Sequence, residues 1–514
     1  MIKIVDSINI LEFEQIVLNS EDIELSAGTL KKIADSFDFL ESFAKNKVIY
    51  GVNTGFGPMA QYRLEDSLRT DLQYNIIRSH SSGMGNTFSP VMSRAVVLAR
   101  LMSFCQGKSA VSTGLASMLA QMLNKNVSPC IYEHGGVGAS GDLVQLAHLA
   151  SVIIGEGEVI YEGRPQDTLS VFKKLEIEPH NIHGREGIAL LNGTSAMTGI
   201  GLLNLIYAKK LLEFSLLFSC MANEIMESYD DHISYELNNS KRHQGQKEIA
   251  KCARNIVADS SLLRSREAEL YREVKETYIN EKVQEYYSMR CYPQILGPVY
   301  DLLQSCENVL INEINSANDN PIIDAETGTV FHGGNFHGDY VSLEMDKMKL
   351  GITRLTMLSE RQLNYLLNSD LNKKLSPFIN MRELGLNFGL QGMQFTATST
   401  TAENQTLSSS MYIHSIPCNN DNQDIVSMGC NAALLAGRVI DNAFDVMAIE
   451  AIALTQAVDY LKIESRLSSK TRRFYSDIRQ IMPAITEDYS TTKVQKLVRE
   501  YLRGKEIKNI FPGK

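Results

Sequence analysis

A glycine-rich segment, HGGVGASGD at residues 134–142, has the strongest potential for chemistry in this sequence. Gly136 to Gly141 match G-x-G-x-x-G, a pattern that brings backbone N–H groups close to a dinucleotide's phosphates at the start of a helix. That pattern requires a buried parallel strand before it, but here Pro129 and a two-residue Ile-Tyr run precede it and no βαβ alternation follows. The match is therefore a weak indication of nucleotide binding. Taken alone, the segment predicts a turn that caps a helix after Asp142.

The glycine-rich segment is one of several motifs that occur together. The others are YGVNTGFG (50–57), ALLNGTSAM (189–197), VQEYYSMR (283–290), SANDNPII (316–323), HGGNFHGDY (332–340) and NQDIVSMG (422–429). In this order they resemble the aromatic amino acid ammonia-lyase and aminomutase family, which includes histidine, phenylalanine and tyrosine ammonia-lyases. The resemblance extends from about residue 10 to about residue 480. The stretches IYGVNTGFGPMAQYR and RSHSSGMG look like a bacterial subgroup with tyrosine ammonia-lyase activity.

The resemblance implies a covalent cofactor made from the chain itself. In the family, the tripeptide that corresponds to Ala139, Ser140 and Gly141 cyclises autocatalytically to 4-methylidene-imidazol-5-one, without a metal or a nucleotide. The unhindered Gly141 nitrogen attacks the Ala139 carbonyl, and loss of water from Ser140 leaves an exposed methylidene carbon. This carbon is an electrophile that no proteinogenic side chain supplies. It captures the substrate amine and makes it a better leaving group, which is a form of covalent catalysis.

The resemblance also implies roles for residues outside the tripeptide. Tyr50 matches the catalytic base that removes the β-proton, and Tyr287 matches a second tyrosine near the leaving amine. Arg290 matches the arginine that binds the substrate carboxylate, for which a guanidinium is a bidentate donor. The other expected substrate-binding residues are Gly57, Ser79, His80, Asn192, Gln284, Asn335, Phe336 and Gln423. Without the family context, packing, capping or surface positions are the commoner places for such residues.

Two positions that resemble the family's specificity sites indicate different substrates. Ser79-His80 is typical of histidine ammonia-lyases, whereas Asn422-Gln423 is typical of tyrosine and phenylalanine ammonia-lyases, because the histidine enzymes usually carry Gln-Glu there. A histidine can hydrogen-bond a phenol, and a site built for that hydroxyl can reject phenylalanine by roughly 10⁴ or more. The sequence therefore predicts deamination of L-tyrosine to trans-p-coumarate and ammonia. Histidine deamination to urocanate is the main alternative, and phenylalanine deamination, 2,3-aminomutase activity and an inactive scaffold remain open.

The elements that position these residues are predicted to be mainly helices. From about Asn192 onward the pattern is helical, and residues 342–368 and 431–462 carry apolar side chains at three- and four-residue spacing. Residues 448–458 are apolar on most faces, which is typical of a helix surrounded by other helices. The sequence therefore predicts a mainly α fold with a long central helical bundle.

The chain is expected to form one continuous architecture with two parts. Residues 1–190 are predicted to form a smaller N-terminal α+β part that carries the catalytic tyrosine loop and the cofactor tripeptide, and residues 191–514 the bundle. Short strands are predicted at residues 47–50, 158–162, 321–324 and 329–331, with the last two forming a hairpin.

Composition limits the classes of partner. The 514-residue chain has 50 Lys and Arg against 60 Asp and Glu, a formal net charge of −10, so we expect no nucleic-acid or anionic-membrane partner. It lacks both a signal-like start and an apolar run of the ~18 residues that a membrane span needs, so we expect a cytoplasmic protein.

Its cysteines show neither C-x-x-C pairs nor zinc spacing and are predicted to be reduced thiols. The expected partner is a small aromatic amino acid, and the resemblance implies a homotetramer whose active sites use three subunits.

Overall fold

The computed structural model describes residues 1–271, 273, 275, 277–505 and 510–511, which divide into two compact units. Unit 1 comprises Met1–Ile206, Cys306–Asp346 and Ser410–Gly437, and unit 2 comprises Tyr207–Ser305, Lys347–Ser409 and Arg438–Lys514. Each unit therefore combines segments that lie far apart in the sequence. The expected boundary near residue 190 remains a prediction.

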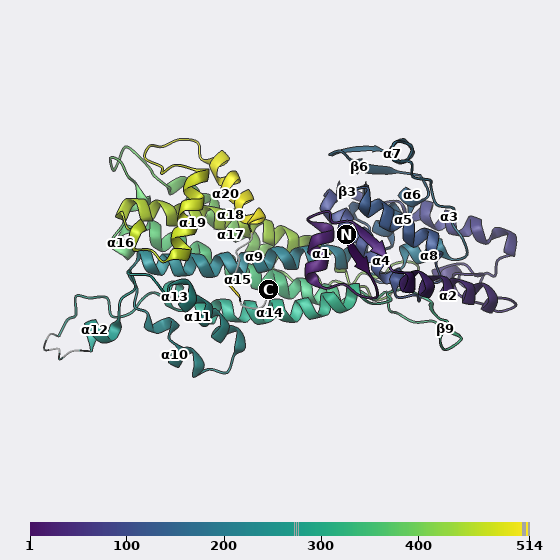
Figure 1. Cartoon of the computed structure of the whole chain (residues 1–514), viewed down its shortest axis with the longest axis horizontal. Coiled ribbons are helices and arrows are strands. Elements are labelled where there is room, and N and C mark those ends of the chain that lie inside the picture. The colour runs from purple at the N-terminus through teal and green to yellow at the C-terminus, as the bar shows by residue number, and fades with distance from the viewer. Residues whose placement is uncertain (272, 274, 276, 506–509, 512–514) are drawn as a thin grey trace. The chain divides into compact units, whose positions relative to one another are not determined.

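Unit 1 contains short and medium-length helices (Figure 1). They are α1 (Ile10–Val17), α2 (Ala27–Phe43), α3 (Arg69–His80), α4 (Pro90–Cys105), α5 (Thr113–Asn124), α6 (Leu143–Ile153), α7 (Thr168–Leu175) and α8 (Glu186–Leu191). Helix α4 begins where the hydroxyl of Ser89 accepts the Met92 N–H at 3.3 Å and Pro90 occupies the first turn, where its missing N–H costs nothing. Every residue of α4 from Ser93 to Cys105 is buried, so this helix lies inside the core of unit 1.

The strands of unit 1 are short. They are β1 (Ile2–Ile4), β2 (Ile23–Leu25), β3 (Met84–Thr87), β4 (Ser128–Pro129), β5 (Tyr132–His134), β6 (Glu158–Tyr161), β7 (Arg164–Asp167), β8 (Ile322–Asp324) and β9 (Thr329–Phe331). β1 pairs with β2 in parallel, whereas β3 with β5, β4 with β6, β6 with β7 and β8 with β9 pair antiparallel. The strand predicted at 158–162 and the predicted hairpin at 321–331 are confirmed.

The strand predicted at residues 47–50 is wrong. The amide of Asn53 folds the backbone into a turn there, because its Oδ1 accepts the Ile49 N–H at 2.9 Å and its Nδ2 donates to the Lys47 carbonyl at 2.6 Å. An asparagine that satisfies backbone groups a few residues away competes with strand pairing. The sequence pattern showed the apolar residues but not this competing contact.

The remaining helices include four long ones, each with residues in both units. The long helices are α9 (Ser195–Ile225), α14 (Tyr292–Ile314), α15 (Asp339–Leu367) and α18 (Gly429–Leu461). The others, all in unit 2, are α10 (Tyr235–Asn239), α11 (Gln244–Ile256), α12 (Arg266–Leu270), α13 (Tyr287–Arg290), α16 (Ser369–Asn372), α17 (Gln391–Leu407), α19 (Ser469–Ile481) and α20 (Thr492–Gly504). Short 3₁₀ turns are η1 (Gly57–Met59), η2 (Asp66–Leu68), η3 (Asp231–Ile233), η4 (Pro377–Ile379) and η5 (Glu464–Arg466).

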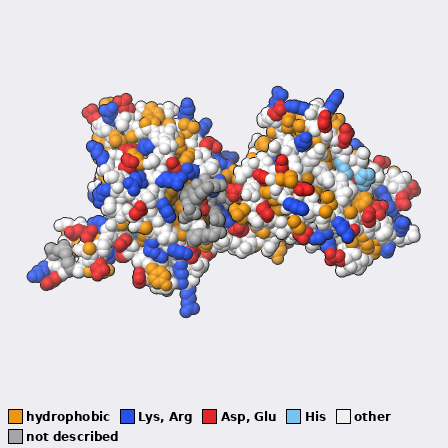
Figure 2. Space-filling model, in the orientation of Figure 1, with side chains coloured by type: hydrophobic (Ala, Val, Ile, Leu, Met, Phe, Trp, Pro, Cys, Tyr) orange, Lys and Arg blue, Asp and Glu red, His pale blue; other side chains and the backbone are white. Residues whose placement is uncertain are grey.

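The helices predicted at 342–368 and 431–462 are confirmed as α15 and α18, and the mainly α fold is confirmed with them. All residues of α18 from Ala448 to Val458 are buried, as the apolar character of most faces of this segment predicts. Among the described residues, no helix combines the length and apolar character that a membrane crossing requires. On the face shown in Figure 2, Lys and Arg side chains are mixed with Asp and Glu. None of the eight cysteines, all within the described residues, forms a disulfide.

Candidate functional site

The loop that carries Ala139, Ser140 and Gly141 joins β5 to α6 and passes tightly against a second backbone segment. Gly141 has a φ of +73°, and a Cβ atom there would lie 2.0 Å from the Gly193 carbonyl oxygen. That oxygen also accepts the N–H of Asp142 at 2.8 Å. Residue 141 must therefore be glycine, for both its backbone conformation and its lack of space.

A second group of contacts holds the beginning of the same loop. The Ser427 hydroxyl donates to the Gly138 carbonyl at 2.9 Å, and the Met428 N–H donates to the Val137 carbonyl at 2.9 Å. The Gly338 N–H also donates to Gly138, at 3.3 Å. The tripeptide is thus fixed at both ends by chain segments that are distant in sequence.

Ser140 and Gln423, two of the site residues predicted from the motifs, are in contact. The Gln423 side-chain N–H donates to the Ser140 hydroxyl oxygen at 3.0 Å. Gln423 ends a tight turn in which it and Cys418 exchange backbone hydrogen bonds of 3.1 and 3.3 Å, and the Cys418 thiol donates to its Oε1 at 3.4 Å. The turn therefore fixes both ends of the glutamine.

The Tyr50 loop reaches the same turn. The Tyr50 hydroxyl oxygen accepts the Gly57 N–H at 3.1 Å, and the Tyr50 ring packs edge-on against Phe56. A Cβ atom at Gly57, whose φ is +53°, would lie 2.8 Å from the side-chain nitrogen of Asn419. Asn419 lies within the Cys418–Gln423 turn, so this turn links the loop of the expected base to Ser140.

Asn192 and Asp142 carry buried polar atoms near the tripeptide. The Oδ1 of Asn192, at the end of α8, is buried and has no hydrogen-bond partner among the described residues. The Asp142 carboxylate accepts the Met197 N–H at 2.8 Å through Oδ2, whereas its Oδ1 is buried without a described partner. Burial raises the pKa of Asp142 to about 7, so this carboxyl can hold or release a proton near neutral pH.

His80 occupies the last position of α3, a helix that packs against α6 and α8, the two helices that flank the tripeptide and Asn192. Its Nδ1 lies 3.0 Å from the Ile76 carbonyl and 3.0 Å from the hydroxyl of Ser79. Because a carbonyl oxygen only accepts, Nδ1 carries the proton and the neutral ring presents Nε2 as an acceptor. Burial lowers the pKa of His80, partly offset by the Ile76 bond, so the ring is neutral at pH 7.

The other predicted residues lie on two further segments. Asn335 and Phe336 precede α15 in unit 1; Asn335 is exposed and donates to the Ala317 carbonyl at 3.4 Å, and Phe336 is half-buried. Gln284, Tyr287 and Arg290 belong to unit 2.

These unit 2 residues are arranged around α13. Tyr287 is 72% exposed, with the Arg290 guanidinium 4.6 Å from its ring centre. The Lys282 ammonium holds the preceding segment by donating to Tyr365 at 2.7 Å and by pairing with the buried carboxylate of Glu285.

Four residues that contact the site segments carry no role in the motif resemblance: Arg100 on α4, Asn318, Asn419 and Ser427. Asn318 lies in the motif SANDNPII and Ser427 in NQDIVSMG, but the resemblance assigns neither residue a role in the site. Arg100 could have been noticed as a charged residue within the apolar run VVLARLMSF. Asn419 gave no signal of its own.

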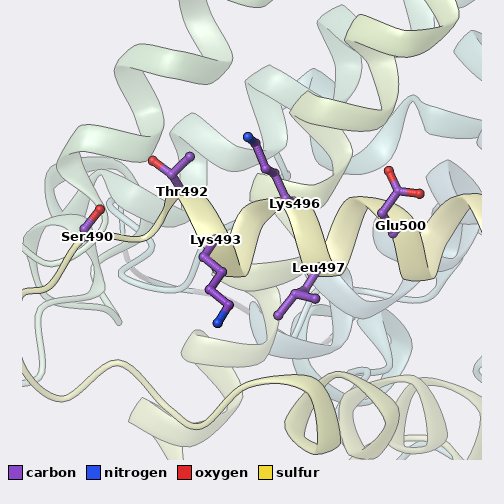
Figure 3. A pocket seen from close by; sticks show the side chains of 6 residues that line it. All are labelled: Ser490, Thr492, Lys493, Lys496, Leu497 and Glu500. Carbon is purple, nitrogen blue, oxygen red and sulfur yellow. The ribbon is translucent and has the colours of Figure 1, made fainter. Parts of the chain in front are cut away.

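A surface hollow along α20 is separate from these residues. It is lined by Ser490, Thr492, Lys493, Lys496, Leu497 and Glu500, with Lys493 and Leu497 projecting from the same side of the helix (Figure 3). None of the predicted site residues lines it. Among the described residues, no group of three or more His, Cys, Asp or Glu side chains is arranged to hold a metal ion.

Comparison with known proteins gives one consistent family. Residues 8–480 match the family described as aromatic amino acid lyase. The chain is 36% identical over 507 residues to histidine ammonia-lyase of Macrococcus caseolyticus, covering 97% of each chain. It is also 36% identical over 501 residues to the MIO-dependent tyrosine 2,3-aminomutase of Streptomyces globisporus, covering 95% of this chain and 92% of the relative. The crystal structure of tyrosine aminomutase from Streptomyces globisporus superposes with a TM-score of 0.93 at 34% identity, covering 98% and 96% of the two chains.

Proposed function

Because the chain belongs to the aromatic amino acid lyase family, we propose that it converts L-tyrosine into trans-p-coumarate and ammonia. It is a carbon–nitrogen lyase that acts on an aromatic amino acid. We further propose that the chain carries the covalent cofactor, uses the site residues named above and forms a homotetramer.

The loop at residues 138–142 fits the covalent ring that the family resemblance implies. Gly141 has no space for a side chain, Ala139 is only 4% exposed, and the Ser140 hydroxyl faces the amide of Gln423. Formed from these three residues, the ring supplies the electrophile that the reaction requires. The same geometry leaves the Ser140 side chain half-buried, on the side where Gln423 lies.

The surrounding residues bind the substrate and move its protons. Tyr50 removes the β-proton, and the Gly57 N–H holds its phenol oxygen in place at 3.1 Å. Asn192, whose buried Oδ1 has no partner among the described residues, offers its amide to the substrate or to the ring. Arg290 binds the substrate carboxylate, Gln284 hydrogen-bonds the substrate and Tyr287 acts near the leaving amine.

The tyrosine preference rests on one observation above the others, the acceptor presented by His80. Its Nε2 can accept the O–H of a substrate phenol, because Nδ1 is committed to the Ile76 carbonyl. At the other specificity position, Gln423 is a neutral amide that donates to the Ser140 hydroxyl before ring closure removes that hydroxyl. A carboxylate there would favour an imidazole, so its replacement by glutamine disfavours histidine as the substrate.

A homotetramer completes the proposed site. Tyr287 is 72% exposed, and large apolar side chains around the Cys418–Gln423 turn are exposed as well. Those side chains are Ile413 (76%), Ile416 (67%) and Ile425 (65%). Exposed apolar groups of this size indicate a surface that a second copy covers. In the family such contacts bring residues of three subunits into one active site.

Two other activities are kept as alternatives, because relatives with comparable identity are named histidine ammonia-lyase and tyrosine 2,3-aminomutase. A panel of L-tyrosine, L-histidine and L-phenylalanine, with products identified by chromatography, separates them. We expect p-coumarate with tyrosine as the preferred substrate. Urocanate as the main product would replace the proposal by histidine deamination, and β-tyrosine as the main product would replace it by the aminomutase.

A further inference from the structure

The backbone next to the tripeptide is held by a buried polar network that the roles above do not use. Arg100, in the middle of α4, is 0% exposed, and its Nη1 donates to the Asn192 carbonyl at 2.7 Å. Its Nη2 donates to the side-chain oxygen of Asn318 at 2.8 Å. The Asn318 amide donates in turn to the Thr194 hydroxyl at 2.9 Å. The network therefore binds the residues before and after Gly193.

Gly193 lies between this network and Gly141 of the tripeptide, and it is packed tightly against both. A Cβ atom at Gly193 would lie 2.6 Å from Nη1 of Arg100 and 2.6 Å from the Asn318 carbonyl oxygen. On its other side, the Gly193 carbonyl lies against Gly141, where a Cβ would approach to 2.0 Å. A change in the network is therefore transmitted to Gly141 through a single residue.

Burial of the Arg100 guanidinium inside α4 costs folding free energy. Its Nε is buried without a described partner, and burial lowers its pKa to about 10, so it remains charged at neutral pH. A buried cation is rarely the most stabilising choice for a helix core. A function in fixing the segments of Asn192 and Asn318 accounts for this cost in stability, whereas packing alone does not.

We propose that Arg100 is a positioning residue for closure of the ring at residues 139–141, an inference that rests on the proposed cofactor. In that closure, a bond forms between the Gly141 nitrogen and the Ala139 carbonyl carbon. The carbonyl oxygen leaves as water with the amide protons of Ser140 and Gly141, and the Ser140 hydroxyl leaves as a second water with the α-proton. No oxidant is required.

Arg100 prevents Gly193 from moving away from Gly141, so that Gly141 stays near Ala139 while Ser427 and Gly338 hold Gly138.

The test compares two buried arginines of the same helix. Arg94 is 6% exposed and donates to the carbonyls of Ile16 and Leu123 and to the side chain of Asn126, none of which is among the hydrogen-bond partners of the tripeptide loop described above. Arg100→Met and Arg94→Met each remove a buried guanidinium from α4. Intact-mass spectrometry then gives the fraction of folded, purified chains that have lost two waters, and thermal unfolding gives their stability.

We expect Arg100→Met to lower the cyclised fraction, or the rate at which it rises, by about tenfold or more, because displacement of a reacting group by about 1 Å costs ~10²-fold. Arg94→Met loses stability but should cyclise as wild type does. A folded Arg100→Met protein that cyclises to the same fraction and at the same rate as wild type overturns the inference, whatever its activity. Wild-type protein without the water loss contradicts the cofactor itself, so the two failures are distinguishable.

If Arg100→Met does not fold, two variants of Asn318 test the same inference. Asn318→Asp retains an oxygen that accepts from Arg100 and should cyclise nearly as wild type does. Asn318→Leu removes that acceptor and should cyclise several-fold less. Equal and complete cyclisation of both variants overturns the inference.

Discussion

The tripeptide loop and helix α18 are both largely buried, but different interactions hold them. From Gly136 to Asp142 the loop is fixed by hydrogen bonds to Gly193, Gly338 and Ser427 and by positive φ angles at Gly138 and Gly141. In α18, by contrast, a continuous run of buried small and apolar side chains packs against other helices. Its buried Glu450 accepts a hydrogen bond from the hydroxyl of Ser359 on α15 through Oε2, whereas its Oε1 is buried without a described partner.

Because of this difference, substitutions in the two regions should affect different properties, ring formation and turnover in the loop and folding free energy in α18. In α18 a side chain can be shortened and the neighbouring residues relax, at a cost in folding free energy. In the loop a displacement of the backbone changes the distance between groups that must react. Variants in the loop should therefore change ring formation or turnover, whereas variants in α18 should change the free energy of unfolding and leave ring formation intact.

The largest effect is expected for Gly141→Ala. The added methyl group meets the Gly193 carbonyl at 2.0 Å and occupies a backbone conformation that alanine disfavours, so the ring should not close and turnover should become undetectable. Gly163→Ala is the matched control, because Gly163 also has a positive φ, +79°, but no atom of the described residues within 4 Å of its Cβ position. That control should lose ~1–2 kcal/mol of stability and cyclise fully. Complete cyclisation of Gly141→Ala, measured by intact mass, would break the comparison.

Tyr50→Phe should lower kcat by roughly 10²–10⁴ while the two-water loss and the unfolding temperature stay near wild type, because only the proton-accepting oxygen is removed. Steady-state kinetics with L-tyrosine measure the effect. If kcat stays within about tenfold of wild type, another residue is the base.

His80→Phe should change the choice of substrate more than the rate. Removing the acceptor for the phenol costs tyrosine one hydrogen bond, worth ~1–3 kcal/mol, so the tyrosine-to-phenylalanine ratio of kcat/KM should fall roughly 10- to 100-fold. Measuring kcat/KM for both substrates on wild type and variant gives this ratio. An unchanged ratio would show that His80 does not contact the substrate ring.

The smallest effect on activity is expected in α18. Ile452 is 0% exposed, and Ile452→Ala should lower the free energy of unfolding by ~2–5 kcal/mol through the cavity that it leaves. Denaturant unfolding measures this loss, and the folded variant should retain full cyclisation and turnover within about twofold. A loss of cyclisation in the folded variant would show that the bundle and the loop are coupled.

The two regions also differ in how far the sequence predicts them. Helix α18 was predictable because its periodicity and apolar run reflect contacts that any helix makes with its neighbours. The loop was found only through motif resemblance, since a G-x-G-x-x-G pattern equally fits a nucleotide site. The three-residue β5 before it pairs antiparallel with β3, which is not the parallel strand that a nucleotide site needs.

Other features depend on contacts between distant residues, which local patterns do not contain. Motif resemblance assigns Ser140 and Gln423 to the same site, but their hydrogen bond follows only from the fold. The positions of Asn419 and Arg100 follow from packing between segments, and the turn at residues 47–50 forms because Asn53 binds its backbone. Such contacts appear only once the chain is folded.

The central claim is that Ala139, Ser140 and Gly141 form a covalent ring, and intact-mass spectrometry of the purified chain tests it most directly. The wild-type chain should be lighter than its sequence mass by two water molecules, with the loss confined to the peptide that contains residues 139–141. Ser140→Ala should not show that loss and should not deaminate tyrosine. A wild-type chain of full sequence mass that is fully active would contradict the account.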